Sequence, residues 1–141
     1  MIRKASAVWN GNLKDGKGTV STESGVLAQT PYSFRSRFET GSGTNPEELL
    51  AAAHAGCFTM ALSAQLTGAG LTPESLSTSA ALTLEKLDAG WTISKVHLEV
   101  TARVPGVNNE SFQKAAADAK ANCPVSRLFK AEITLKATLA N

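Results

Sequence analysis

The sequence predicts an α+β fold, because strand-like and helix-like segments do not alternate regularly along the chain. Strand patterns fill the first third; a long apolar helix, a hairpin, two further helices and a last strand follow. We expect two antiparallel sheet portions around long central helices. At 141 residues the chain should form a single domain over residues 1–141, with a sizeable core.

Three short strands are predicted before the long helix. The first two cover residues 3–9 and 17–22, and Asn10-Gly11 and Asp15-Gly16 provide turn signals between them. The third covers residues 32–38, where the letters alternate in YSFRSRF. In such a strand Arg35 and Arg37 share one face with Ser33, and the other face carries Tyr32, Phe34, Ser36 and Phe38.

A long helix is predicted from residue 46 to about 67. Asn45 is a good N-cap, Pro46 a good first helical residue, and Glu48 falls three residues after the cap. Residues 49–66 are poor in charge, but their apolar stretches are short and interrupted by polar side chains, so we expect no membrane span. A helix that is apolar on most sides is hard to cover within one small domain. A homodimer that sandwiches two such helices would cover it.

The C-terminal half reads as a hairpin, two helices and a strand. Residues 78–87 and 91–104 form the hairpin arms, with a bulge expected near Ser94-Lys95. Asn108 or Asn109 caps the helix ESFQKAAADAKA, a short helix begins at Pro124 directly after Cys123, and the last strand covers residues 131–139.

Charge and the N-terminus limit the partners and the compartment. The net charge is +2 with no long basic run, so nucleic acid is not an expected partner. The first residues contain no apolar stretch of the secretory type, which favours a cytoplasmic protein. In that compartment a cysteine pair is more often catalytic or metal-binding than a permanent disulfide.

The chain has two cysteines, Cys57 in LLAAAHAGCFTMAL and Cys123 in NCPVSRLF. A reactive thiol with one resolving partner is sufficient for thiol redox chemistry. The alternative is a pair of buried, inert cysteines, since free cysteine is among the most buried residue types.

A thiol buried in an apolar helix needs a cation before it ionises readily. Arg35 and Arg37 are the candidates, and Glu47 or Glu48 could hold the guanidinium in place. Glu47 and Cys57 are ten residues apart, or about 15 Å along a straight helix. One arginine can therefore serve both only if the helix is kinked near residues 53–56 or if two subunits share the site.

The two histidines do not indicate a metal centre. His54 lies three residues before Cys57 and could act as a base, although a lone histidine on an apolar helix is more often a packed, hydrogen-bonded side chain. His97 lies on the polar face of a strand and should be at the surface. The paired spacing of zinc ligands is absent, as are a phosphate loop, a Ser-His-Asp signature and a nucleotide fingerprint. We expect no metal and no cofactor.

Three segments together resemble the family of osmotically inducible protein C and organic hydroperoxide resistance proteins (OsmC/Ohr). They are GKGTVSTESGVL, RFETGSGTNPEELLAAAHAGCFTMAL and NCPVSRLFKAEITL, and the resemblance extends over essentially the whole chain. The histidine in AAHAGCF is similar to the osmotically inducible branch, whereas the other branch tends to carry an aromatic residue there.

The resemblance implies a thiol-dependent peroxidase that works as an intertwined homodimer. By position, Cys57 matches the peroxidatic cysteine, Cys123 the resolving cysteine, Arg37 the activating arginine and Glu47 the glutamate that orients it. The implied partners are an organic hydroperoxide and a dithiol reductant such as the dihydrolipoyl group of a lipoylated carrier protein. Apolar residues near Cys57 fit organic hydroperoxides better than hydrogen peroxide: Phe58, Met60 and Leu62.

Two other functions remain open from the residues alone. The first is a dimeric stress protein that binds an apolar ligand and whose cysteines are not catalytic. The second is a redox-sensing regulator, although no DNA-reading helix or basic stripe supports it.

Overall fold

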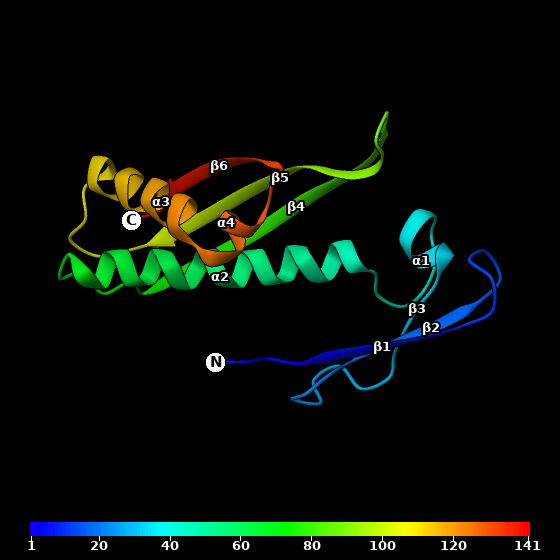
Figure 1. Cartoon of the computed structure of the whole chain (residues 1–141). Helices are drawn as coiled ribbons and strands as arrows, with labels where there is room; N and C mark the ends of the chain where they lie inside the picture. Colours follow the sequence, from blue (N-terminus) through cyan, green and yellow to red (C-terminus); the bar gives the residue numbers. More distant parts are fainter. The chain divides into compact units, whose positions relative to one another are not determined.

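The computed structural model describes all 141 residues and contains two compact units, Met1–Leu49 and Leu50–Asn141. Figure 1 shows the elements of both units, coloured along the chain. The expected α+β class is confirmed: there are two three-stranded sheets together with helices. The single domain over residues 1–141 stays a prediction.

The first unit contains an antiparallel sheet in the order β1-β2-β3. Its strands are β1 (Ala5–Asn10), β2 (Lys17–Thr22) and β3 (Thr30–Tyr32). Gly18 pairs with both Trp9 and Tyr32, and the centroids of these two rings are 5.4 Å apart. A Cβ at position 18 would overlap both rings, so only glycine allows this aromatic pair to form across the sheet.

The prediction of a strand over residues 32–38 was wrong. β3 ends at Tyr32, and helix α1 (Phe34–Phe38) follows. Ser33 and Ser36 form a capping box: the Ser33 Oγ accepts from the Ser36 N–H at 3.1 Å, and the Ser36 Oγ accepts from the Ser33 N–H at 2.9 Å. These local bonds stabilise a helical turn in a segment whose alternation indicated a strand.

The long helix α2 (Pro46–Gly68) confirms the predicted start. The Asn45 Oδ1 accepts from the Glu48 N–H at 2.8 Å, as an N-cap should, whereas the Glu48 carboxylate accepts from the Thr44 hydroxyl. The helix is uninterrupted over its 23 residues and its ribbon shows no kink at residues 53–56 (Figure 1). The kink that would let one arginine serve both Glu47 and Cys57 within a single chain is therefore not observed.

The second unit contains a mixed sheet in the order β4-β5-β6. Strands β4 (Ser75–Leu87) and β5 (Gly90–Arg103) form the predicted hairpin, and the register shift at Thr83/Leu84 leaves Ser94 as the extra residue of the predicted bulge. Strand β6 (Glu132–Leu139) pairs with β5 in parallel, which departs from the expected antiparallel pairing. The reason is the connection: helices α3 (Asn109–Asn122) and α4 (Pro124–Leu128) cross over between β5 and β6.

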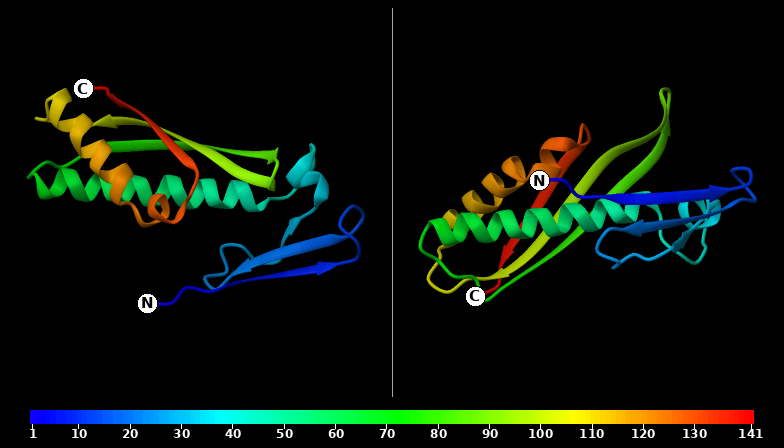
Figure 2. Two further views of the ribbon diagram at one scale, coloured as in Figure 1. Left: turned by 45° about the horizontal axis from the view of Figure 1, so that its top comes forward. Right: turned by 60° about the horizontal axis from the view of Figure 1, so that its bottom comes forward.

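Helices α2 and α3 cover one face of this second sheet, as Figure 2 shows from two sides. The inward residues of β5 alternate as predicted, and the opposite face of the sheet is exposed. Burial of this apolar surface is the main stabilising term of the unit. The buried cluster consists of Phe58, Leu62, Leu66, Val96, Leu98, Val100, Ala102, Val104, Phe112, Ala116, Ala119 and Cys123.

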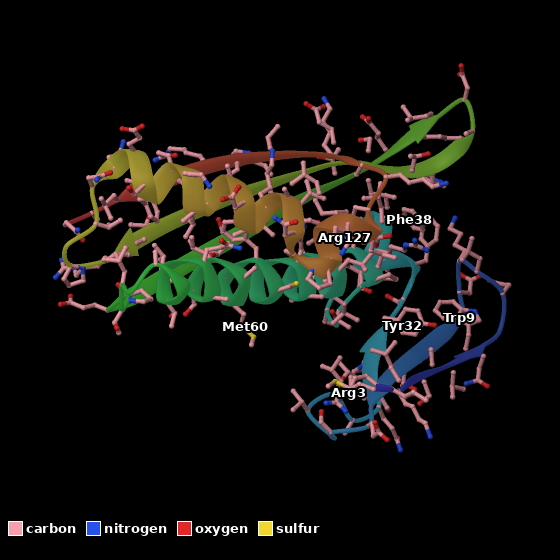
Figure 3. The ribbon with its side chains drawn as sticks, turned by 60° about the vertical axis from the view of Figure 1, so that its left-hand side comes forward. Arg3, Trp9, Tyr32, Phe38, Met60 and Arg127 are labelled. Carbon is pink, nitrogen blue, oxygen red and sulfur yellow. The ribbon has the colours of Figure 1, made fainter.

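The opposite side of α2 faces away from the core of its own unit. We call it the open face; its residues follow helical spacing and are Ala53, Gly56, Met60, Ala64 and Thr67. Met60 is 76% exposed and points away from the sheet (Figure 3). By length and composition α2 could cross a membrane, and only 22% of its most apolar 18-residue window is buried. This apolar helix therefore has a side that the rest of its own unit does not cover.

Candidate active site

The two cysteines, 66 residues apart in sequence, meet in the second unit. Cys57 is half-buried on α2, and Cys123 is fully buried between α3 and α4. The Cys123 thiol donates a hydrogen bond to the Cys57 sulfur, and the two Sγ atoms are 2.7 Å apart. Both thiols are free, and a disulfide bond would need them at about 2.05 Å. The two sulfurs therefore need to move only slightly closer together to form a disulfide bond.

The position of Cys123 follows from the turn between α3 and α4. Its N–H donates to the Ala119 carbonyl at 2.9 Å and so ends α3, while its carbonyl accepts from the Arg127 N–H at 3.1 Å and begins α4. Pro124 is the first residue of α4, where its missing N–H costs nothing. The predicted short helix that begins at Pro124 is thus confirmed.

The surroundings of Cys57 oppose its ionisation. Burial is the main cause that raises the pKa of the Cys57 thiol, and the hydrogen bond from Cys123 raises it further. The backbone N–H of Val125 in α4 donates to the Cys57 sulfur and lowers the pKa, but by less than the other causes raise it. A thiolate at Cys57 therefore needs a cation from outside this thiol pair.

A second pair, Arg37 and Glu47, meets in the first unit. The Arg37 Nη2 donates to Glu47 Oε1 at 2.7 Å, and its Nε donates to both carboxylate oxygens at 3.1 and 3.2 Å. Glu47 is 11% exposed and Arg37 37% exposed. The guanidinium also lies 5.2 Å from the centroid of the Phe38 ring. Charge-assisted bonds of this kind fix the plane of a guanidinium and leave its Nη1 for another group.

Hydrogen bonds between α1 and the start of α2 hold this ion pair together. The Ser36 hydroxyl donates to the Thr44 carbonyl at 2.7 Å, and the Asn45 amide donates to the Ser36 carbonyl at 3.0 Å. Gly43 has φ +100°, and a Cβ there would overlap the Pro31 carbonyl, so the turn into α2 requires glycine. The N-terminus of α2 and α1 are thereby joined, with Arg37 next to Glu47.

The structure separates the candidates that the sequence left open. Arg35 forms a surface pair with Glu39 at 3.6 Å, and Glu48 binds Thr44, so neither belongs to the buried ion pair. The structure brings together Arg37 with Glu47 in one unit and Cys57 with Cys123 in the other.

An aromatic pocket of about 300 Å³ lies beside Arg37 in the first unit. It is lined by Trp9, Leu13, Tyr32, Ser33, Phe34, Arg37 and Phe38. Figure 3 shows Trp9 and Tyr32 next to each other at this sheet. The apolar residues expected to favour an organic substrate are placed differently: Phe58 and Leu62 are fully buried in the core, and Met60 points outward. Phe58 and Leu62 are therefore explained by packing in the core and do not by themselves indicate the substrate.

The histidines lie where the sequence predicted. His54 is fully buried, and its Nε2 shares a hydrogen bond of 2.7 Å with the Ser126 hydroxyl. His97 is exposed and bonds Thr134. Sequence reasoning assigned no part to Ser126 or to the Val125 N–H, because their approach to α2 depends on the packing of α4. No group of three or more metal-ligating side chains gathers in the structure.

Comparison with protein families matches residues 39–138 to the family described as OsmC-like protein. The chain belongs to the OsmC-like family. It is 56% identical to Peroxiredoxin OsmC of Escherichia coli (strain K12) over 133 residues, which cover 94% of this chain and 93% of that protein. It is 32% identical to the organic hydroperoxide resistance protein of Xanthomonas axonopodis pv. citri (strain 306), over 71% of this chain and 69% of that protein.

Solved structures of OsmC-like proteins share the fold. The organic hydroperoxide resistance protein of Elizabethkingia anophelis matches with a TM-score of 0.69 and 25% identity, over 100% of this chain and 98% of that chain. The OsmC-like protein of Mycoplasma pneumoniae matches with a TM-score of 0.79 and 15% identity, over 100% and 99% of the two chains. Family membership, expected from the three sequence segments, is confirmed.

Proposed function

We propose that this protein is a thiol-dependent peroxidase that reduces organic hydroperoxides to alcohols. The observation that carries the proposal is the free thiol pair, with the Cys57 and Cys123 sulfurs 2.7 Å apart. The names of the relatives, a peroxiredoxin and an organic hydroperoxide resistance protein, support the same activity. Cys57 is the attacking thiol, since it is half-exposed whereas Cys123 is buried.

The first step is attack by the Cys57 thiolate on the terminal peroxide oxygen. The S–O bond forms, the O–O bond breaks, Cys57 becomes a sulfenic acid, and the alkoxide takes a proton and leaves as the alcohol. Arg37, oriented by Glu47, stabilises the thiolate and the negative charge that develops on the leaving oxygen. Burial raises the pKa of Cys57, and this cation opposes that effect by favouring the thiolate.

The second step forms a disulfide. The Cys123 sulfur attacks the Cys57 sulfur, and the hydroxyl of the sulfenic acid leaves as water with the proton of the Cys123 thiol. Disulfide formation prevents further oxidation of Cys57 to the irreversible acids. An external dithiol then restores both thiols by exchange, and a dihydrolipoyl group on a carrier protein fits this role. Such cycling suits a reducing compartment, so we place the protein in the cytoplasm.

The aromatic pocket beside Arg37 favours an organic hydroperoxide over hydrogen peroxide. Its rings provide apolar surface for a carbon substituent, while the guanidinium lies where the polar peroxide group would bind. A volume of about 300 Å³ suits a small alkyl or aryl group. Hydrogen peroxide has no substituent to fill this space.

A homodimer would cover the open face of α2. Its small residues allow close approach of a second copy, and Met60 adds a large adaptable apolar side chain. On an uninterrupted helix Glu47 and Cys57 differ by about 15 Å along the axis. The Arg37 held by Glu47 of one chain therefore serves Cys57 of the second copy, so that each site is shared.

The activity is tested by treating the reduced protein with one equivalent of cumene hydroperoxide and measuring intact mass and free thiols. We expect rapid loss of both thiols as an internal disulfide, while Cys123→Ser stops at a sulfenic acid and Cys57→Ser does not react. Unreacted thiols in the wild-type protein would refute the peroxidase. They would instead favour a dimeric binding protein whose apolar pocket holds a ligand and whose cysteines are not catalytic.

A further inference from the structure

The hydrogen bond between His54 and Ser126 connects the two helices that carry the thiols. His54 lies three residues before Cys57 on α2, and Ser126 lies three residues after Cys123 on α4. The two side chains are buried, 72 residues apart in sequence, and their Nε2 and Oγ atoms are 2.7 Å apart. The bond therefore joins α2 to α4 about one helical turn from each sulfur.

Stability alone does not explain this polar pair. The His54 Nδ1 is buried without a hydrogen-bond partner, and the ring packs against Phe129 with centroids 5.2 Å apart. An unsatisfied buried polar atom is unfavourable, and an apolar pair of similar shape would avoid it. A buried polar bond that costs stability is a candidate for a role in positioning.

Helix α4 has only five residues, and Val125 and the following Phe129 pack against the apolar core. The His54–Ser126 bond adds a buried, directional contact between this short helix and α2. Two groups that act on Cys57 depend on α4: the Cys123 sulfur at its start and the Val125 N–H. A small shift of α4 would move both away from the Cys57 sulfur.

We propose that the His54–Ser126 hydrogen bond is a positioning device for disulfide formation. It holds Cys123 where it attacks the Cys57 sulfenic acid before a second peroxide does; this role rests on the proposed peroxidase function. The step forms one S–S bond, breaks the S–O bond of the sulfenic acid and releases water with the Cys123 proton. Without the bond, Cys123 attacks the sulfenic acid more slowly and more Cys57 reaches the sulfinic acid.

The test compares variants that keep or lose this bond. Ser126→Ala removes the hydroxyl. His54→Asn carries an amide that reaches only as far as Nδ1, whereas His54→Gln carries one that reaches the place of Nε2. Thr59→Val is the matched control, because the Thr59 hydroxyl joins α2 to Thr78 on β4 over the same 2.7 Å and does not involve α4.

Each reduced variant is given a graded excess of cumene hydroperoxide, and the ratio of sulfinic acid to disulfide is read by mass. We expect Ser126→Ala and His54→Asn to raise this ratio about tenfold, the effect of one ordinary hydrogen bond. His54→Gln and Thr59→Val should stay close to the wild-type ratio. The ratio reports only how the sulfenic acid divides between disulfide and sulfinic acid, so it does not depend on the rate of the first attack. Wild-type ratios in Ser126→Ala and His54→Asn would overturn the inference.

A second measurement does not depend on peroxide. In a glutathione redox buffer, the equilibrium between thiols and disulfide gives the effective concentration of Cys123 at Cys57. Ser126→Ala should lower it about tenfold relative to Thr59→Val. If Ser126→Ala lowers this effective concentration but the protein does not react with peroxide, the positioning bond is supported and the peroxidase is rejected. An unchanged effective concentration would reject the positioning bond whether or not the protein reduces peroxides.

Discussion

Arg37 and Arg35 stand two residues apart in α1 and have different surroundings. Arg37 makes three hydrogen bonds to a carboxylate that is 11% exposed, whereas Arg35 reaches the exposed Glu39 at 3.6 Å. A well-oriented pair with a largely buried partner holds its geometry, but an exposed pair contributes little. The difference makes Arg35 a natural control for Arg37.

Arg37→Lys should lower the rate of Cys57 oxidation about a hundredfold, because an ammonium cannot bind Glu47 and a developing oxyanion in one plane. Burial already raises the pKa of Cys57, so weakening its cation raises the pKa further. The thiolate then appears only at higher pH, and the pH–rate profile should move to the alkaline side. Stopped-flow kinetics against pH measure both effects. An equal loss in Arg35→Lys would contradict the assignment.

Helix α2 combines two roles on opposite sides. One side carries His54, Phe58, Leu62 and Leu66 into the core at steps of four residues, and the other is the open face. Gly56 lies in the middle of the open face, and a Cβ there would meet nothing within 4 Å in the chain alone. Glycine in a helix interior costs roughly 0.5–1 kcal/mol relative to alanine. Its presence is explained if a second copy approaches closely at this point.

Gly56→Leu should therefore weaken the proposed dimer, although nothing in the chain itself lies within 4 Å of a Cβ at this position. We expect the dimer dissociation constant to rise at least about tenfold, as for an overpacked contact. Sedimentation over a concentration series measures it. Ala117→Leu, at an exposed position of α3, is the control and should leave the dimer intact. An unaffected dimer in Gly56→Leu would show that the open face is not the interface.

At the scale of the whole molecule, the two functional pairs belong to different units of the chain. Arg37 and Glu47 belong to Met1–Leu49, and Cys57 and Cys123 to Leu50–Asn141. A symmetric dimer can supply each site with one pair from each copy, and a two-fold axis then creates two equal sites. This arrangement predicts that two inactive variants complement one another.

Mixing Arg37→Ala with Cys57→Ser, after unfolding and refolding together, should restore activity. In a mixed dimer one site combines the intact Arg37 of one copy with the intact Cys57 of the other. Random pairing makes half of the dimers mixed, so about one quarter of the wild-type peroxidase rate is expected. Each variant refolded alone is the control. No recovery in a mixture shown by mass to contain mixed dimers would place each site within one chain.

Much of the site could be predicted from the sequence, but some of it could not. The cysteines, the long helix, its Asn45 cap and the bulge at Ser94 have strong local signals, and all appear in the structure. The segment at residues 32–38 was misassigned because its alternating sequence pattern indicates a strand. The Ser33–Ser36 capping box favours a helical turn instead, and its hydrogen bonds decide the outcome. The pairing of His54 with Ser126 has no local signal at all.

By itself the sequence determined the α+β class, the family resemblance and the four residues proposed for the chemistry, because these depend on residue types, spacing and turn signals along the chain. Only the tertiary structure showed the geometry of the Arg37–Glu47 pair, how close the sulfurs lie, and which side of α2 faces away from the core of its unit. Those outcomes depend on packing between segments far apart in the chain, where burial and geometry, and not local propensity, select the contacts.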